Sequence, residues 1–249
     1  MSELFSIQLQ NQQQSRDGVW LDLPTTTEQV QAALRQIGIS SDNPQGLFIS
    51  GYFAEEEKRF AISYNMVLAS NVDELNFLAS RLETLSTGER AELNAALQAP
   101  QSELFSIGRI TDFPENVDYY VHLPDVHGPA QLGDYYLNRS GMVNMPEEWK
   151  GGIDTAQFGR YVAQQEQGAF TQYGYLVKSG DEWQKVHEGQ PVPEEYRVLS
   201  FPAPEVLRDS ANIPPPVQPE TEPQKVIPII LNGKDSAERM KEITDRLET

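Results

Sequence analysis

Residues 151–177 change from a helical to a strand-like pattern, and this change restricts the chain to a fold that combines both kinds of element. Asp154 is a residue type that caps helices. Three apolar side chains follow it at helical spacing: Phe158, Tyr161 and Val162. Gly168 suits the left-handed residue that ends such a helix. Residues 169–177 are then rich in aromatic side chains, which favours a strand.

The N-terminal part of the chain contains three segments that predict strands. They are residues 5–9, 19–23 and 47–53, and together they indicate a small sheet. Trp20, in the second segment, is expected in the core. Between the second and third segments, apolar residues at helical spacing predict one helix, which Gly38 ends. These apolar residues are Val30, Ala33, Leu34 and Ile37.

Three pairs of residues match the capping box, in which an N-cap residue and the residue three positions later bind each other's backbone N–H groups. The pairs are Thr25 with Glu28, Asn71 with Glu74, and Ser86 with Glu89. We therefore expect helices to begin at these points, including an amphipathic helix over residues 71–85. On that helix, Asp73 is predicted to face solvent, opposite a stripe of apolar side chains.

The charge balance of the chain is strongly acidic. It has 19 basic and 37 acidic residues, and the resulting net charge of −18 is spread along its length. Such a charge repels nucleic acid and anionic membranes and attracts basic surfaces. We therefore expect no direct nucleic-acid binding by residues 1–200 and no membrane association. The alternative interpretation is that the acidic residues serve solubility alone.

The sequence contains no cysteine, which excludes disulfides, thiol catalysis and cysteine-ligated zinc. It has no apolar run near the length of about 18 residues that a membrane-spanning helix needs. Its first residues lack the basic and then apolar pattern of a signal peptide. These features together predict a cytoplasmic protein.

His122, Asp125 and His127 come closest to a metal-binding set. Pro124 and Pro129 interrupt any helix that could align them. A zinc site also needs a further strong ligand and a supporting shell, so histidines in a surface loop are the simpler interpretation. The chain contains no glycine-rich nucleotide-binding motif and no nucleophile elbow. We therefore expect no cofactor and no enzymatic activity.

Residues 213–223 are rich in proline, which predicts an extended linker. After the linker, Asp235 is placed to cap a last helix. The whole pattern predicts an elongated α+β protein of two or three small units made of short sheets and helices, in which residues 183–200 add strands to the last unit. The expected divisions are 1–66, 67–125 and 126–200, then a linker over 201–234 and a terminal helix over 235–249.

Short motifs occur in order over about residues 5–177 that resemble those of the ArdA-type antirestriction proteins. They are Gly18–Pro24 (GVWLDLP), Asp73–Asn76 (DELN), Asn116–Tyr120 (NVDYY), Leu132–Tyr135 (LGDY), Ile153–Asp154, Phe158–Arg160 (FGR), Gly168–Thr171 (GAFT) and Gly174–Tyr175. Thr155–Gln157 departs from the family pattern, in which a Tyr-Glu pair follows the Asp. Residues 237–247 are similar to the start of an ArdC/LtrC-like single-stranded-DNA-binding domain.

The resemblance implies a homodimeric mimic of B-form DNA that inhibits type I restriction–modification enzymes and catalyses nothing. Carboxylates would take the places of DNA phosphates and face the enzyme's Lys and Arg side chains. The rival hypothesis is a regulatory or structural module of a larger conjugation or mobile-element protein. Charge and resemblance select these carboxylates: Glu55, Glu56, Glu57, Asp73, Glu74, Glu83, Glu89, Glu92, Asp112, Glu115, Asp118, Asp134, Glu147, Glu148, Asp154 and Glu166.

Overall fold

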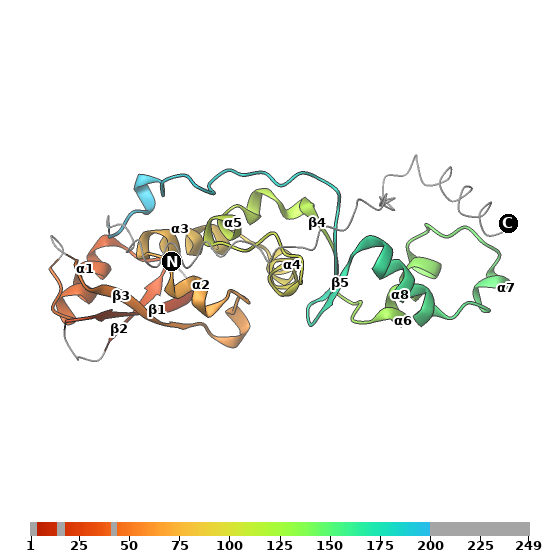
Figure 1. The fold of residues 1–249 in the computed structure, drawn as a ribbon, viewed down its shortest axis with the longest axis horizontal. Helices are drawn as coiled ribbons and strands as arrows, with labels where there is room; N and C mark the ends of the chain where they lie inside the picture. Colours follow the sequence, from red (N-terminus) through yellow and green to blue (C-terminus); the bar gives the residue numbers. More distant parts are fainter. Residues whose placement is uncertain (1–3, 14–17, 41–43, 200–249) are drawn as a thin grey trace, which may run out of the picture. The chain divides into compact units, whose positions relative to one another are not determined.

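The computed structural model describes residues 4–13, 18–40 and 44–199, with the exception of the Glu57 side chain. The chain divides into two compact units (Figure 1). Among the described residues, unit 1 comprises those up to Leu97, Gln101–Val117 and residues 184–199, and unit 2 comprises Gln98–Pro100 and Asp118–Trp183. The predicted mixture of helices and short sheets is confirmed, because each unit contains one three-stranded sheet with helices beside it.

The sheet of unit 1 has β1 (Phe5–Asn11) at its centre, paired antiparallel with β2 (Val19–Leu23) and β3 (Leu47–Phe53). All three predicted strands are confirmed. The prediction for Trp20 is wrong, since its side chain is 50% exposed. Alternation along β2 buries Leu21 and Leu23 and turns Trp20 outward. The Trp20 ring makes an edge-to-face contact with the Phe53 ring, with the two ring centroids 6.4 Å apart.

The helices of unit 1 are α1 (Thr27–Gln36), α2 (Tyr64–Leu68), α3 (Val72–Glu83), α4 (Thr87–Gln98) and α5 (Ile107–Thr111), with short 3-10 helices η1 (Glu56–Lys58), η2 (Phe113–Glu115) and η5 (Glu194–Tyr196). The capping boxes at Asn71 and Ser86 form as predicted. The first box lies one residue later than predicted, between Thr26 and Gln29. Thr25 is buried instead, and its backbone N–H donates to Asn76 Oδ1 at 2.7 Å.

Buried asparagines join distant segments of unit 1. Asn76, on α3, accepts the Thr25 N–H and donates to the carbonyl of Tyr196 at 3.0 Å. Asn94, on α4, accepts the N–H of Ala61 at 2.7 Å and donates to the carbonyl of Arg59. Because these bonds cross the expected division at 66/67, residues on both sides of it share one unit.

Unit 2 is built on a sheet in which β6 (Gly174–Lys178) lies between β4 (Tyr120–Leu123) and β5 (Ala169–Thr171). Its helices are α6 (Pro129–Asp134), the π-helical turn η4 (Tyr135–Arg139), α7 (Glu147–Lys150) and α8 (Thr155–Glu166), and η3 (Val117–Tyr119) precedes β4. Helices α6 and α8 approach closely through glycines, because a Cβ at Gly133 would lie 1.9 Å from the carbonyl oxygen of Thr155. Their inner faces join one apolar core: Val126, Leu132, Tyr136, Val162, Ala163 and Tyr175.

Helix α8 begins at the Asp154 cap as predicted, but it ends differently. The left-handed residue is Gln167, with φ of 56°, and not Gly168. Glycine is needed at position 168 for space, because a Cβ there would lie 1.9 Å from the Tyr175 hydroxyl. Tyr161 was expected on the apolar face and is 57% exposed, so only Phe158 and Val162 of that set pack inward.

Residues 184–199, all of which the structure describes, form no strand and belong to unit 1 (Figure 1). The prediction that they add strands to the last unit is therefore wrong. The expected linker over 201–234 and terminal helix over 235–249 lie outside the described residues. Within the described part of the chain, no helix is both long and apolar enough to cross a membrane.

Candidate functional site

The described surface is dominated by carboxylates. Fourteen acidic side chains are exposed, against seven basic ones, among the residues that the structure describes. Of the predicted set, seven are exposed: Glu55, Glu56, Glu83, Asp118, Glu147, Glu148 and Asp154. Six are half-buried: Glu74, Glu89, Glu92, Glu115, Asp134 and Glu166. Asp73 and Asp112 are buried, and the Glu57 side chain lies outside the described part.

Several members of the set form ion pairs within the chain. Glu55 contacts Lys58 at 3.0 Å and Glu147 contacts Lys150 at 2.7 Å, each within one turn of chain. Two further pairs join Asp134 to Arg139 and Glu115 to Arg81. The carboxylates of Glu55, Asp134 and Glu147 lie at the surface, where an ion pair contributes about 1 kcal/mol or less. An incoming Lys or Arg can therefore compete for these three at small cost, whereas both partners of the Glu115–Arg81 pair are partly buried.

Three carboxylates cap helices and also reach the surface. Asp154 accepts the N–H groups of Ala156 and Gln157 at 2.9 and 3.0 Å. Glu74 and Glu89 complete capping boxes on α3 and α4. The hydrogen bond from Ser86 lowers the pKa of Glu89. Replacing any of these side chains therefore also weakens a helix N-terminus.

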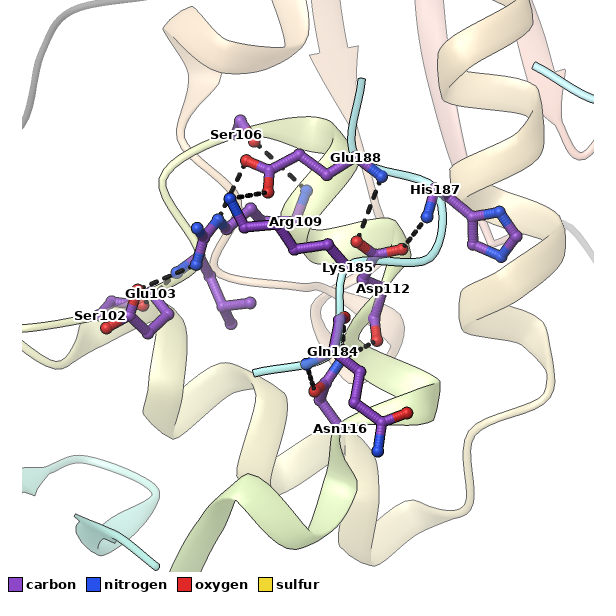
Figure 2. Close-up of polar contacts among 11 residues, drawn as sticks. Ser102, Glu103, Ser106, Arg109, Asp112, Asn116, Gln184, Lys185, His187 and Glu188 are labelled. Carbon is purple, nitrogen blue, oxygen red and sulfur yellow. Dashed lines mark hydrogen bonds and ion pairs between the residues drawn. The ribbon is translucent and has the colours of Figure 1, made fainter. Parts of the chain in front are cut away.

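Asp73 and Asp112 bind the protein's own backbone. Asp73 Oδ1 accepts the N–H groups of Val198 and Leu199 at 2.6 and 2.7 Å. Asp112 also accepts two successive N–H groups, one on each oxygen: those of His187 at 2.6 Å and Glu188 at 3.2 Å (Figure 2). The prediction that Asp73 faces solvent is wrong, because a returning segment covers that side of α3. Neither carboxylate is placed to receive a partner's side chain.

Glu166 is engaged inside unit 2. Its two oxygens accept hydrogen bonds from the hydroxyls of Tyr136, at 2.5 Å, and Tyr175, at 3.0 Å. Burial raises the pKa of Glu166, and the two hydrogen bonds oppose that shift. Burial also raises the pKa of both tyrosines. These three side chains link η4, α8 and β6, so Glu166 has a structural role.

Sequence reasoning missed seven exposed carboxylates: Asp22, Glu28, Asp125, Asp181, Glu182, Glu194 and Glu195. Two adjacent acidic pairs, at 181–182 and 194–195, were visible in the sequence and signal solvent exposure. They lie beyond the last motif of the resemblance, so motif matching did not select them.

The three residues considered for a metal do not form one group. His122 lies on β4, and its Nε2 is 2.7 Å from the carbonyl oxygen of Tyr173. Asp125 and His127 are exposed in the following loop. Over residues 4–199, apart from the short undescribed gaps, no three His, Cys, Asp or Glu side chains are arranged to hold a metal ion.

Comparison with known proteins identifies the chain's relatives. The family model of the antirestriction protein ArdA matches residues 13–177, about two thirds of the sequence. No curated protein matches the chain significantly. The match spans all the motifs from residue 18 onward on which the resemblance rests, and it ends before the segment that returns to unit 1. The chain therefore belongs to the ArdA family of antirestriction proteins, which act on restriction–modification enzymes and are not known as enzymes themselves.

Proposed function

We propose that this protein inhibits type I restriction–modification enzymes by occupying their DNA-binding groove as a mimic of DNA. The observation that carries the proposal is the twofold excess of exposed acidic over exposed basic side chains. This excess occurs in both units. The described residues of unit 1 include seven exposed acidic and four exposed basic side chains, and Asp118–Trp183 of unit 2 includes seven and three.

Carboxylates suit this task because they reproduce two properties of DNA phosphates. They carry negative charge, and they accept paired hydrogen bonds from Arg side chains. Phosphate contacts position an enzyme on DNA, whereas base contacts read the sequence. A protein that presents carboxylates and no base edges should therefore inhibit whatever target sequence the enzyme recognises.

The proposed mimic surface retains most of the carboxylates that charge and resemblance select. It omits Asp73, Asp112 and Glu166, which serve the fold. It comprises Glu55, Glu56, Glu57, Glu74, Glu83, Glu89, Glu92, Glu115, Asp118, Asp134, Glu147, Glu148 and Asp154. The proposal includes a homodimer that acts in the cytoplasm, contacts the methyltransferase and specificity subunits, and does not itself bind nucleic acid.

Steady-state inhibition at several DNA concentrations tests the proposal. The apparent inhibition constant for a type I enzyme should rise in proportion to DNA concentration. A non-specific duplex should also protect the enzyme from inhibition, to the extent that its affinity for the enzyme predicts. Inhibition that stays unchanged at saturating DNA would show binding elsewhere on the enzyme. Absence of any binding to the enzyme would favour the rival hypothesis of a module in a larger mobile-element protein.

A further inference from the structure

Residues 184–199, which we term the strap, return to unit 1 after the chain has passed through unit 2. The strap lies beyond residue 177, where the family match ends. Its only regular element is the short helix η5, so it cannot hold its position by its own secondary structure. Side chains of unit 1 bind it at three places, two of which are drawn in Figure 2.

The first place is Asn116, whose amide binds both backbone groups of Gln184. Asn116 Nδ2 donates to the Gln184 carbonyl at 2.9 Å, and Asn116 Oδ1 accepts the Gln184 N–H at 2.7 Å. The same Nδ2 donates to the carbonyl of Asp112 at 2.8 Å. Asn116 is 4% exposed. Its buried amide binds the backbone of Asp112 and that of Gln184.

The second place is Asp112, which is fully buried. Its two oxygens each accept one of two successive N–H groups, those of His187 and Glu188. The Glu188 side chain then accepts a hydrogen bond from Arg109 Nε at 3.0 Å, and Arg109 also binds Glu103 at 2.9 Å (Figure 2). Hydrogen bonds to an ionised acceptor are among the stronger ones in proteins.

The third place is the start of α3. Asp73 accepts two successive N–H groups, those of Val198 and Leu199. One turn along the helix, Asn76 donates to the Tyr196 carbonyl, and the Phe77 ring lies 4.8 Å from the Tyr196 ring. The arrangement at Asp112 is thus repeated at the other end of the strap: a buried aspartate takes a pair of N–H groups and an asparagine takes a carbonyl.

We infer that unit 1 contains a binding site that recognises a polypeptide segment through its backbone, and that the strap is its occupant. Asp112 and Asp73 recognise paired N–H groups, and Asn116 and Asn76 recognise carbonyls. A buried carboxylate without these donors would bear a large desolvation penalty. The site and the strap therefore depend on each other, and two of the chain's acidic residues act as internal anchors.

Loss of one anchoring aspartate should release the nearer end of the strap and leave the other end bound, because each aspartate serves its own pair of N–H groups. Amide hydrogen exchange of the full-length chain reports this residue by residue, since exchange requires local opening. The measurement uses no restriction enzyme, so its outcome is independent of the proposed function.

The experiment compares Asp112→Asn and Asp73→Asn with Asp118→Asn, which removes the same charge at an exposed position. In the parent chain, the amides of residues 187, 188, 198 and 199 should exchange at least tenfold slower than those of an unstructured peptide. Asp112→Asn should accelerate exchange at 187 and 188 at least tenfold, and Asp73→Asn should do so at 198 and 199. The control should change neither pair.

A strap-side pair of variants covers the case in which an aspartate variant fails to fold. Leu199→Pro removes an N–H donor while Asp73 stays intact, and Leu199→Ala shortens the side chain but keeps the donor. Only the proline variant should accelerate exchange at residue 198. Fast exchange along the strap of the parent chain, or equal effects of Leu199→Pro and Leu199→Ala, would overturn the inference.

Discussion

Asn116 and Gln184 bind each other's polar groups in both directions, although they are 68 residues apart in the sequence. They flank the segment 118–183 that forms most of unit 2. The chain therefore leaves unit 1 and returns to it at two points that one asparagine side chain holds together. The Asn116 side chain thus links the part of the chain just before segment 118–183 to the part just after it.

Asn116→Ala should destabilise the protein and specifically free Gln184. Removal of one partner of buried hydrogen bonds costs about 1–3 kcal/mol for each group left unsatisfied. Urea unfolding measures this loss, and amide exchange at residue 184 reports the local effect. Asn94→Ala is the matched control, because Asn94 makes similar backbone bonds that do not involve the strap. Equal acceleration at residue 184 in both variants would contradict the assignment.

Removing residues 212–249 should leave the melting temperature and the inhibition of a restriction enzyme nearly unchanged. The deletion spares the strap, and the proline-rich sequence at its start is of a kind that does not build a core. Removing residues 184–249 should lower the melting temperature clearly, since Asp73 and Asp112 would then lose their donors. Calorimetry of the two shortened chains separates these cases. If both deletions behave alike, the strap contributes nothing to stability.

Glu166→Gln should change the dependence of stability on pH. Because burial raises the folded-state pKa of Glu166, its charge costs folding free energy above that pKa. The cost should disappear as the pH falls from the folded-state pKa to the unfolded value of about 4.3. The parent chain should therefore gain stability relative to the variant across that window. Urea unfolding between about pH 4 and 7, with the exposed Glu148→Gln as control, measures the difference.

A parallel pH dependence of parent and Glu166→Gln would show that the two tyrosine hydroxyls compensate fully for burial. The control should track the parent, since Glu148 is exposed and its charge costs the fold little.

Charge on the mimic surface should act collectively. Glu56→Gln alone should weaken binding to the enzyme by less than about tenfold, because one exposed contact contributes about 1 kcal/mol or less. Replacement of five exposed glutamates by glutamine should weaken it far more and flatten its salt dependence. The five are Glu55, Glu56, Glu83, Glu147 and Glu148. None of them is a helix-capping side chain, so the fold should survive.

The matched control for this variant replaces five glutamates of the tail, at positions 220, 222, 238, 242 and 248. It removes the same charge from outside the mimic surface. Isothermal titration against a type I methyltransferase at two salt concentrations compares the variants. Equal weakening by both sets would mean that net charge alone drives binding, and that the surface has no defined geometry.

The parts of the fold that could be predicted are those with a local signature. The alternation of apolar and polar residues predicts strands at β1 to β3. The capping residues at 71 and 86 predict the starts of two helices, because capping depends on neighbours within four positions. The strap had no such signature. It is held by its backbone, which every sequence shares, and its partners at 73 and 112 look like any other acidic residue of the chain.

The same limit applied to the candidate site. Charge and motif identified acidic residues, but exposure depends on which segment covers which face, and the sequence does not give that. The sequence pattern predicts Asp73 on the solvent side, opposite an apolar stripe, but its carboxylate binds the backbone of residues 198 and 199. Trp20 shows the reverse error, since an aromatic residue expected in the core stands on the open face of the sheet.

A protein that mimics DNA must compete with DNA for one groove of the enzyme. Displacement of a fluorescent duplex from a type I methyltransferase tests this competition most directly, with one duplex that carries the target sequence and one that lacks it. The protein should displace both duplexes completely, at concentrations that scale with each duplex's affinity. A ternary complex of enzyme, duplex and this protein, stable at saturating concentrations of all three, would contradict competition for one groove.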